Sequence, residues 1–111
     1  MTGVFYTRKR EKIFKRGIRL SSERLKFISS TRVVVNRSSV NSGQQVENIS
    51  VSYEVPEGTK LVVPVFGGCN WGNIVSSQLE DLLSGSFTVS AINLSSENHT
   101  LVIVFNIYFF G

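Results

Sequence analysis

The chain has 111 residues, of which 41% are hydrophobic and 18% charged, a composition that excludes disorder throughout and a soluble coiled coil. Its net charge of +4 is unevenly distributed, since residues 1–37 carry +9 (11 cations, 2 acids) and residues 38–111 carry −5 (1 cation, 6 acids). We therefore expect one domain, with a basic arm over residues 1–30 and a mildly acidic body over residues 31–111.

The basic arm mixes cations with single apolar residues. Its apolar positions do not recur at helical spacing, whereas Ile18-Arg19-Leu20 and Leu25-Lys26-Phe27 alternate as half-buried strands do. We expect short extended segments that dock on a protein partner, because phosphate binding alone would not need the apolar residues. The candidate docking residues are Arg8, Lys9, Arg10, Lys12, Phe14, Lys15, Arg16 and Arg19. The alternative is that these cations bind nucleic acid.

From Thr31 onward the chain is rich in β-branched residues and punctuated by turn residues, which predicts an all-β body. The expected strands cover residues 31–36, 46–55, 61–66, 73–77, 86–94 and 99–109, with loops at 37–43 and 67–73 and a helical turn at 78–83. Pro64 cannot donate to a ladder, so its strand is placed at an edge or a bulge. With the arm segments this gives about seven to eight short strands, arranged as an antiparallel β-sandwich or a jelly-roll-like barrel.

The last expected strand is apolar on both faces. Leu101, Ile103, Phe105, Ile107 and Phe109 form one face, and Val102, Val104, Asn106, Tyr108 and Phe110 form the other. Both faces should therefore be covered, which indicates a central strand between packed layers or a strand at a subunit interface. The candidate interface residues are Val102, Val104, Tyr108 and Phe110.

Groups that could support catalysis or bind a metal are scarce. The chain has one histidine, His99, and one cysteine, Cys69, which excludes an internal disulfide. A nucleophile needs a base, and a metal needs several ligands at set spacings, and neither pattern is present. We expect no enzyme activity, no metal and no cofactor. The longest apolar run, residues 101–110, is too short for a membrane helix, so we expect no membrane insertion.

Trp71, the single tryptophan, lies between two asparagines of the glycine-rich loop. Its ring could stack on a sugar that Asn70 and Asn73 hydrogen-bond, so Asn70, Trp71 and Asn73 are the candidate glycan contacts. The alternative is a tryptophan that anchors its loop to the core.

Three segments resemble those of the small β-rich tail-associated structural proteins of tailed bacteriophages. They are Gly17-Ile-Arg-Leu-Ser-Ser-Glu-Arg-Leu-Lys-Phe-Ile28, Val55-Pro-Glu-Gly-Thr-Lys-Leu-Val-Val63 and the closing apolar strand from Leu101 to Gly111. The resemblance covers residues 17–111, and residues 1–16 have no counterpart in those phage proteins. It implies a virion component, made in the host cytoplasm, that assembles in several copies and has no catalytic residues.

The sequence therefore predicts a non-enzymatic structural protein of a phage tail or tail tip, which contacts itself and other virion proteins. Two alternatives stay open. One is a glycan-binding β-sandwich used in host adsorption, and the other is a capsid-type protein that binds nucleic acid through the basic arm.

Overall fold

The computed structural model describes residues 24–111, so the candidate docking residues between Arg8 and Arg19 lie outside the described residues. Within residues 24–111 the fold is all-β. Its elements are β1 (Phe27–Val40), β2 (Gln45–Ser52), β3 (Leu61–Cys69), β4 (Gly72–Gln78), the 3-10 helix η3 (Leu82–Ser84), β5 (Ser86–Asn93) and β6 (His99–Phe110). None of these residues forms a helix that could span a membrane.

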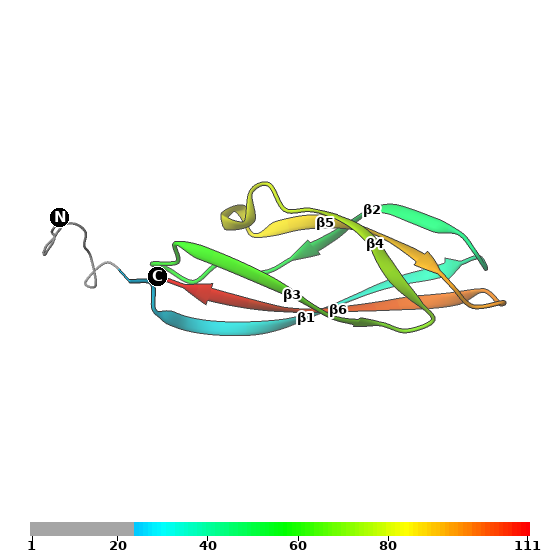
Figure 1. The fold of residues 1–111 in the computed structure, drawn as a ribbon, viewed down its shortest axis with the longest axis horizontal. Coiled ribbons are helices and arrows are strands. Elements are labelled where there is room, and N and C mark those ends of the chain that lie inside the picture. The colour runs from blue at the N-terminus through cyan, green and yellow to red at the C-terminus, as the bar shows by residue number, and fades with distance from the viewer. Residues whose placement is uncertain (1–23) are drawn as a thin grey trace, which may run out of the picture.

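The strands form two three-stranded antiparallel sheets, in the orders β1-β6-β3 and β2-β5-β4 (Figure 1). The two sheets pack face to face in an elongated body with extents of 63 × 26 × 18 Å. A barrel requires every strand to have two neighbours. Here β1, β3, β2 and β4 each have one, so the alternative of a jelly-roll-like barrel is wrong and the described residues form an open sandwich.

The number of strands in the described residues is six, fewer than the seven to eight expected for the chain. The main reason is that the segments predicted around residues 25–27 and 31–36 belong to one strand, β1, which also continues through the predicted loop to Val40. A bulge between Arg37 and Val40 allows this, since it turns the fully buried Val40 side chain into the core despite the polar serines before it.

The predicted glycine-rich loop at residues 67–73 is mostly strand. Residues 67–69 complete β3, Gly72 opens β4, and only Asn70 and Trp71 form the turn between them. Gly72 is required by close packing, because a Cβ atom there would lie 2.0 Å from the carbonyl oxygen of Ile92. Similarly, the predicted helical turn at residues 78–83 is shorter and later, at η3.

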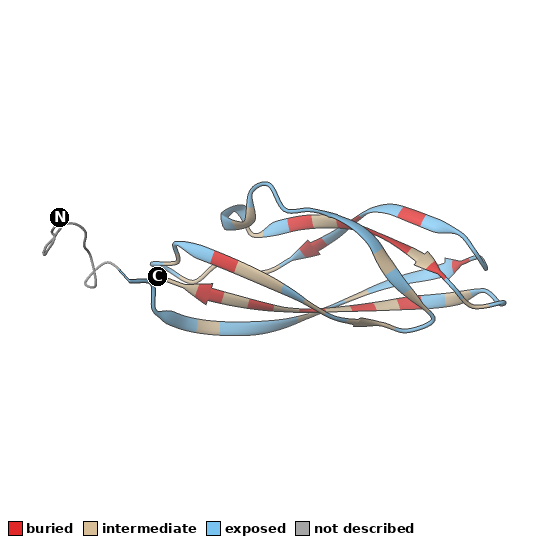
Figure 2. Ribbon diagram, viewed as in Figure 1, coloured by how far each residue is buried: buried red, intermediate tan, exposed pale blue. Residues whose placement is uncertain are grey.

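Strand β6 is the centre of its sheet, as the sequence predicted, and β3 with Pro64 lies at an edge. The inner side chains of β6 are all at most 4% exposed and fill the core together with residues of β2 and β5 (Figure 2). The Phe105 ring contacts those of Phe66 and Phe87 edge to face, with centroids 5.5 and 5.1 Å apart. Alternating strands thus bury one face each against the opposite sheet.

Asn93, at the end of β5, is a fully buried polar residue. Its Nδ2 donates hydrogen bonds to the carbonyls of Val40 and Glu97, and its Oδ1 accepts one from the Ser95 N–H, each at 2.9 Å. The amide therefore joins the end of β1 to the β5–β6 turn. Buried polar groups of this kind are stabilising only while every partner is present.

We expect Asn93→Leu to lower the free energy of unfolding by about 3 kcal/mol, because it leaves two carbonyls and one N–H without their partners. Urea denaturation followed by circular dichroism measures the loss. The matched control is Asn73→Leu, since the exposed Asn73 side chain accepts a hydrogen bond only from the adjacent Ile74 N–H. Equal losses in the two variants would contradict the bridging role of Asn93.

Candidate functional site

The solvent-facing side of the β1-β6-β3 sheet is largely apolar, although Ser30, Arg32, Asn36 and Asn106 also lie on it. Residues directly opposite each other in neighbouring strands share a face, so the pairing register places Phe27, Phe110 and Leu61 in one row and Ser30, Tyr108 and Val63 in the next. We call this surface the apolar outer face. Its apolar members are Phe27, Val34, Leu61, Val63, Val65, Val102, Val104, Tyr108 and Phe110.

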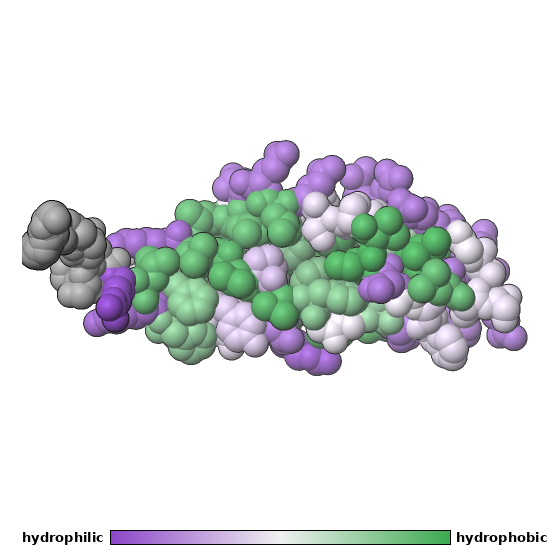
Figure 3. Space-filling view, viewed as in Figure 1, coloured by the Kyte–Doolittle hydropathy of each residue, from purple (hydrophilic) through white to green (hydrophobic). Residues whose placement is uncertain are grey.

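These residues are open to solvent in the single chain. Phe27 is 58% exposed and Val34 47%, while Tyr108 and Phe110 are half-buried. Gly67 adds to the exposure, because its missing side chain leaves Val104 uncovered: a Cβ atom there would lie 3.1 Å from Val104 Cγ1. Figure 3 shows apolar surface running along much of the body between hydrophilic margins.

The four candidate interface residues therefore lie together on this face, all half-buried. The sequence led us to expect that both faces of β6 would be covered. Within residues 24–111 only the inner face of β6 is covered by the opposite sheet, and no layer covers its outer face. Polar residues interrupt it at its middle, where Arg32, Asn106 and Val65 form one row.

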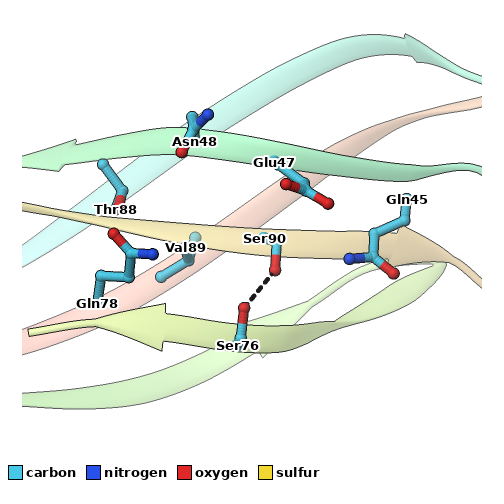
Figure 4. A pocket seen from close by; sticks show the side chains of 8 residues that line it. All are labelled: Gln45, Glu47, Asn48, Ser76, Gln78, Thr88, Val89 and Ser90. Carbon is cyan, nitrogen blue, oxygen red and sulfur yellow. Dashed lines mark hydrogen bonds between the residues drawn. The ribbon is translucent and has the colours of Figure 1, made fainter.

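The solvent-facing side of the other sheet is polar. Along β5, Ser86, Thr88 and Ser90 face outward, and their partners in β2 and β4 include Ser50, Ser52, Ser76 and Gln78. A shallow hollow of about 110 Å³ lies there, lined by polar side chains from all three strands (Figure 4). The Ser76 and Ser90 hydroxyls are hydrogen-bonded across it at 2.6 Å. The two outer faces of the sandwich thus differ sharply in polarity.

Trp71 lies at the β3–β4 turn, with its indole 54% exposed. The indole stacks flat on the imidazole of His99, with ring centroids 3.9 Å apart and planes 3° from parallel. The backbone of Trp71 has a positive φ of 63°, which is uncommon for residues other than glycine. The sequence could not reveal this pair, since the two residues are 28 positions apart and no local pattern relates them.

The two candidate asparagines near Trp71 make different hydrogen bonds. Asn70 Oδ1 accepts a hydrogen bond from the Val102 N–H at 2.6 Å, so this side chain holds the turn against β6. Asn73 is exposed and makes the local bond to Ile74 already described. Next to His99 lies an open hollow of about 210 Å³, bordered by Ser39, Asn98 and Thr100. The polar groups that share this hollow with His99 therefore come from β1, the β5–β6 turn and β6.

A second hollow, of about 260 Å³, lies at the opposite end of the body, between the start of β3 and η3. We call it the acidic groove; it is lined by residues 60–62 and 79–83. Leu79 and Leu83 are about half exposed, and Glu80 and Asp81 are both exposed.

Tyr53 supports the acidic groove from inside. Its hydroxyl donates a 2.7 Å hydrogen bond to the Leu82 carbonyl. Burial raises the pKa of Tyr53 above its usual 10.0, and the negative charge of Asp81 raises it further.

Among residues 24–111, no group of three or more histidine, cysteine or carboxylate side chains lies together as metal ligands would. Cys69 is half-buried, and burial raises the pKa of its thiol. A thiol with a raised pKa is a poorer nucleophile at neutral pH. The apolar outer face, the Trp71–His99 pair and the acidic groove are thus the candidate sites. Comparison of the chain with protein-family models, curated proteins and solved structures finds no match.

The raised pKa of Tyr53 predicts a loss of stability in alkali. A folded-state pKa above the unfolded value stabilises the protein at every pH below about 10, and this contribution disappears as the pH rises through the folded pKa. The absorbance of the Tyr53 tyrosinate is obtained as the difference between the wild type and Tyr53→Phe. We expect it to appear at a higher pH than that of an ordinary tyrosine. Asp81→Asn should lower this pH part of the way toward the ordinary value. Glu80→Gln is the control and should leave it in place; ionisation of Tyr53 at its usual pH would contradict the effect.

Proposed function

We propose that the protein is a non-enzymatic structural subunit that assembles through its apolar outer face. The supporting observation is the contrast between the two sheets, since the outer face of β2-β5-β4 is mostly polar, with Ile92 as an apolar exception, whereas the other outer face has nine apolar residues. Large apolar patches on soluble proteins mark interaction sites, whereas scattered apolar residues do not. The phage-tail resemblance of the sequence would make this assembly part of a virion, at the tail or its tip.

The size of the face bears on the kind of assembly. Strand β6 has 12 residues, so the sheet is about 40 Å long and, with three strands, about 14 Å wide. A flat footprint of about 560 Å² falls below the roughly 800 Å² that each partner gives to a standard interface. The outer face can therefore provide the apolar centre of an interface, while a stable complex needs further contact area.

A second copy of the chain is the partner that best fits this face. The face is held by backbone pairing, because its central strand β6 is paired with β1 along most of its length and with β3 from Ile103 to Phe110. Its rows are mainly apolar on either side of Arg32 and Asn106, although Asn36 lies beside Val102 near one end. A copy turned by a twofold axis would therefore place mainly apolar rows against each other. Such self-complementary surfaces are what closed dimers use.

The test is the mass of the full-length protein in solution, measured by light scattering. We expect the wild type to exceed the 12.4 kDa of one chain and the double variant Val34→Asp, Val65→Asp to fall toward it, since it places two charges beside β6 on exposed edge-strand positions. The matched control is Ser52→Asp, Gln78→Asp, which flanks β5 on the polar face. A monomeric wild type, or the same fall in the control, would overturn the proposal.

A second candidate function is glycan binding, and the Trp71–His99 stack favours it. An exposed, positioned indole with hydroxyl and amide groups nearby offers a sugar both a ring to stack on and hydrogen-bond partners. In a virion this would serve host adsorption.

For this second function we expect Trp71→Ala to abolish retention on the glycans of an array that the wild type binds, because the stacking surface is lost. The mass in solution should stay unchanged, since Trp71 lies outside the apolar outer face. Val75→Ala, an exposed apolar substitution in the adjacent β4, is the control. If no glycan is retained by the wild type, or if Trp71→Ala binds as well, the glycan-binding function is excluded.

A further inference from the structure

We infer that the acidic groove of one copy receives the basic N-terminal segment, residues 1–23, of a second copy. This inference rests on the proposed assembly function and identifies its second contact. It starts from the composition of the groove, in which Leu61, Leu79 and Leu83 are each at least 42% exposed and flank two exposed carboxylates, Glu80 and Asp81.

Charge at this end of the body favours a cationic occupant. Backbone hydrogen bonds join Tyr53 to Gly85 and Lys60 to Phe110, so the β2–β3 connection lies next to η3 and the end of β6. Four of the six acidic residues of the body are therefore gathered at this end: Glu54, Glu57, Glu80 and Asp81. Lys60 borders the groove as well, so the charged residues that line it sum to −1, while Lys26, hydrogen-bonded to Gly111, lies at the same end of the body on the β1 side.

The sequence of residues 1–23 matches both properties of the groove. It has seven lysines and arginines against two glutamates, a net charge of +5. Single apolar residues stand next to cations, as in Phe14-Lys15 and Ile18-Arg19. A segment of this kind can place apolar side chains against the exposed leucines while its cations reach the carboxylates. Phosphate binding would account for the charge alone.

The start of the described chain lies at the same end as the groove. The Lys26 N–H and C=O are both hydrogen-bonded to Gly111, and the chain leaves the body there (Figure 1). In the sheet order β1-β6-β3, residue 24 emerges beside β1, whereas the groove lies beyond β3. The segment of the same copy would have to turn back across the end of β6 to enter it.

Length permits the exchange between copies. Twenty-three residues span at most about 75 Å when extended, which exceeds the 63 Å length of the body. A segment leaving one copy can therefore reach the groove of a neighbour that contacts it through the apolar outer face. This contact supplies the additional area that the sheet face lacks for a standard interface.

The test is cross-linking between two full-length chains, each with Cys69→Ser to remove the native thiol. One chain has Phe14→Cys and the other Leu83→Cys; after mixing and mild oxidation, intact mass spectrometry measures the mixed disulfide. We expect it to form several-fold faster than with Ser52→Cys, an exposed control on the polar sheet, in place of Leu83→Cys. Adding Glu80→Lys and Asp81→Lys should reduce the rate toward the control.

Three outcomes would overturn the inference. The first is an equal rate of mixed-disulfide formation for Leu83→Cys and the control. The second is a disulfide that forms only within one chain carrying both Phe14→Cys and Leu83→Cys. The third is a mixed disulfide that forms no faster than the control while the full-length protein binds an oligonucleotide in a salt-dependent way. The mass measurement on Val34→Asp, Val65→Asp is independent. If that variant falls to a monomer while cross-linking equals the control, the outer-face assembly stands and only the groove assignment fails.

Discussion

The fold depends on β6 being paired on both sides while its inner side chains occupy the core. Leu101, Ile103 and Ile107 have no exposed surface, and Phe105 and Phe109 have almost none. These residues contact side chains from the opposite sheet, so the two sheets are held together mainly along this one strand.

The same strand explains why assembly is the best-supported function. In β5, the central strand of the other sheet, the outer residues are serine and threonine apart from Ile92, and hydroxyl side chains need no cover. In β6 the outer residues are valine, tyrosine and phenylalanine, apart from Asn106. A small domain gains nothing in its own stability from leaving such residues in water. The assembly that we propose would cover them.

Local patterns in the sequence predicted what depends on local chemistry. The period-two alternation located β5 and β6 closely, and the missing N–H of Pro64 placed β3 at an edge. The loop predicted at residues 37–43 is a shorter turn at residues 41–44, because Ser38 and Ser39 belong to a bulge of β1. The loop predicted at residues 67–73 is mostly strand, because Gly72 is needed for close packing and Gly67 and Gly68 continue β3. The Trp71–His99 stack and the acidic groove join segments far apart in the chain, so no pattern within one segment could reveal them.

The edge strands indicate how copies can and cannot meet. An open sandwich offers unpaired backbone groups along β1, β2, β3 and β4, and such edges invite strand addition. In all four strands the pairing is interrupted by a bulge or register shift, between Phe27 and Ser29 in β1, Val46 and Ile49 in β2, Phe66 and Gly68 in β3, and Ile74 and Ser76 in β4.

Bulges of this kind disrupt a regular ladder and discourage a second molecule from extending it. Pro64 removes a further donor from the β3 edge. The edges thus disfavour association through the backbone, whereas the outer face of β1-β6-β3 keeps its apolar side chains accessible. If copies assemble as we propose, the sheet face is therefore the surface that remains open to them, where side chains would determine the partner and the register.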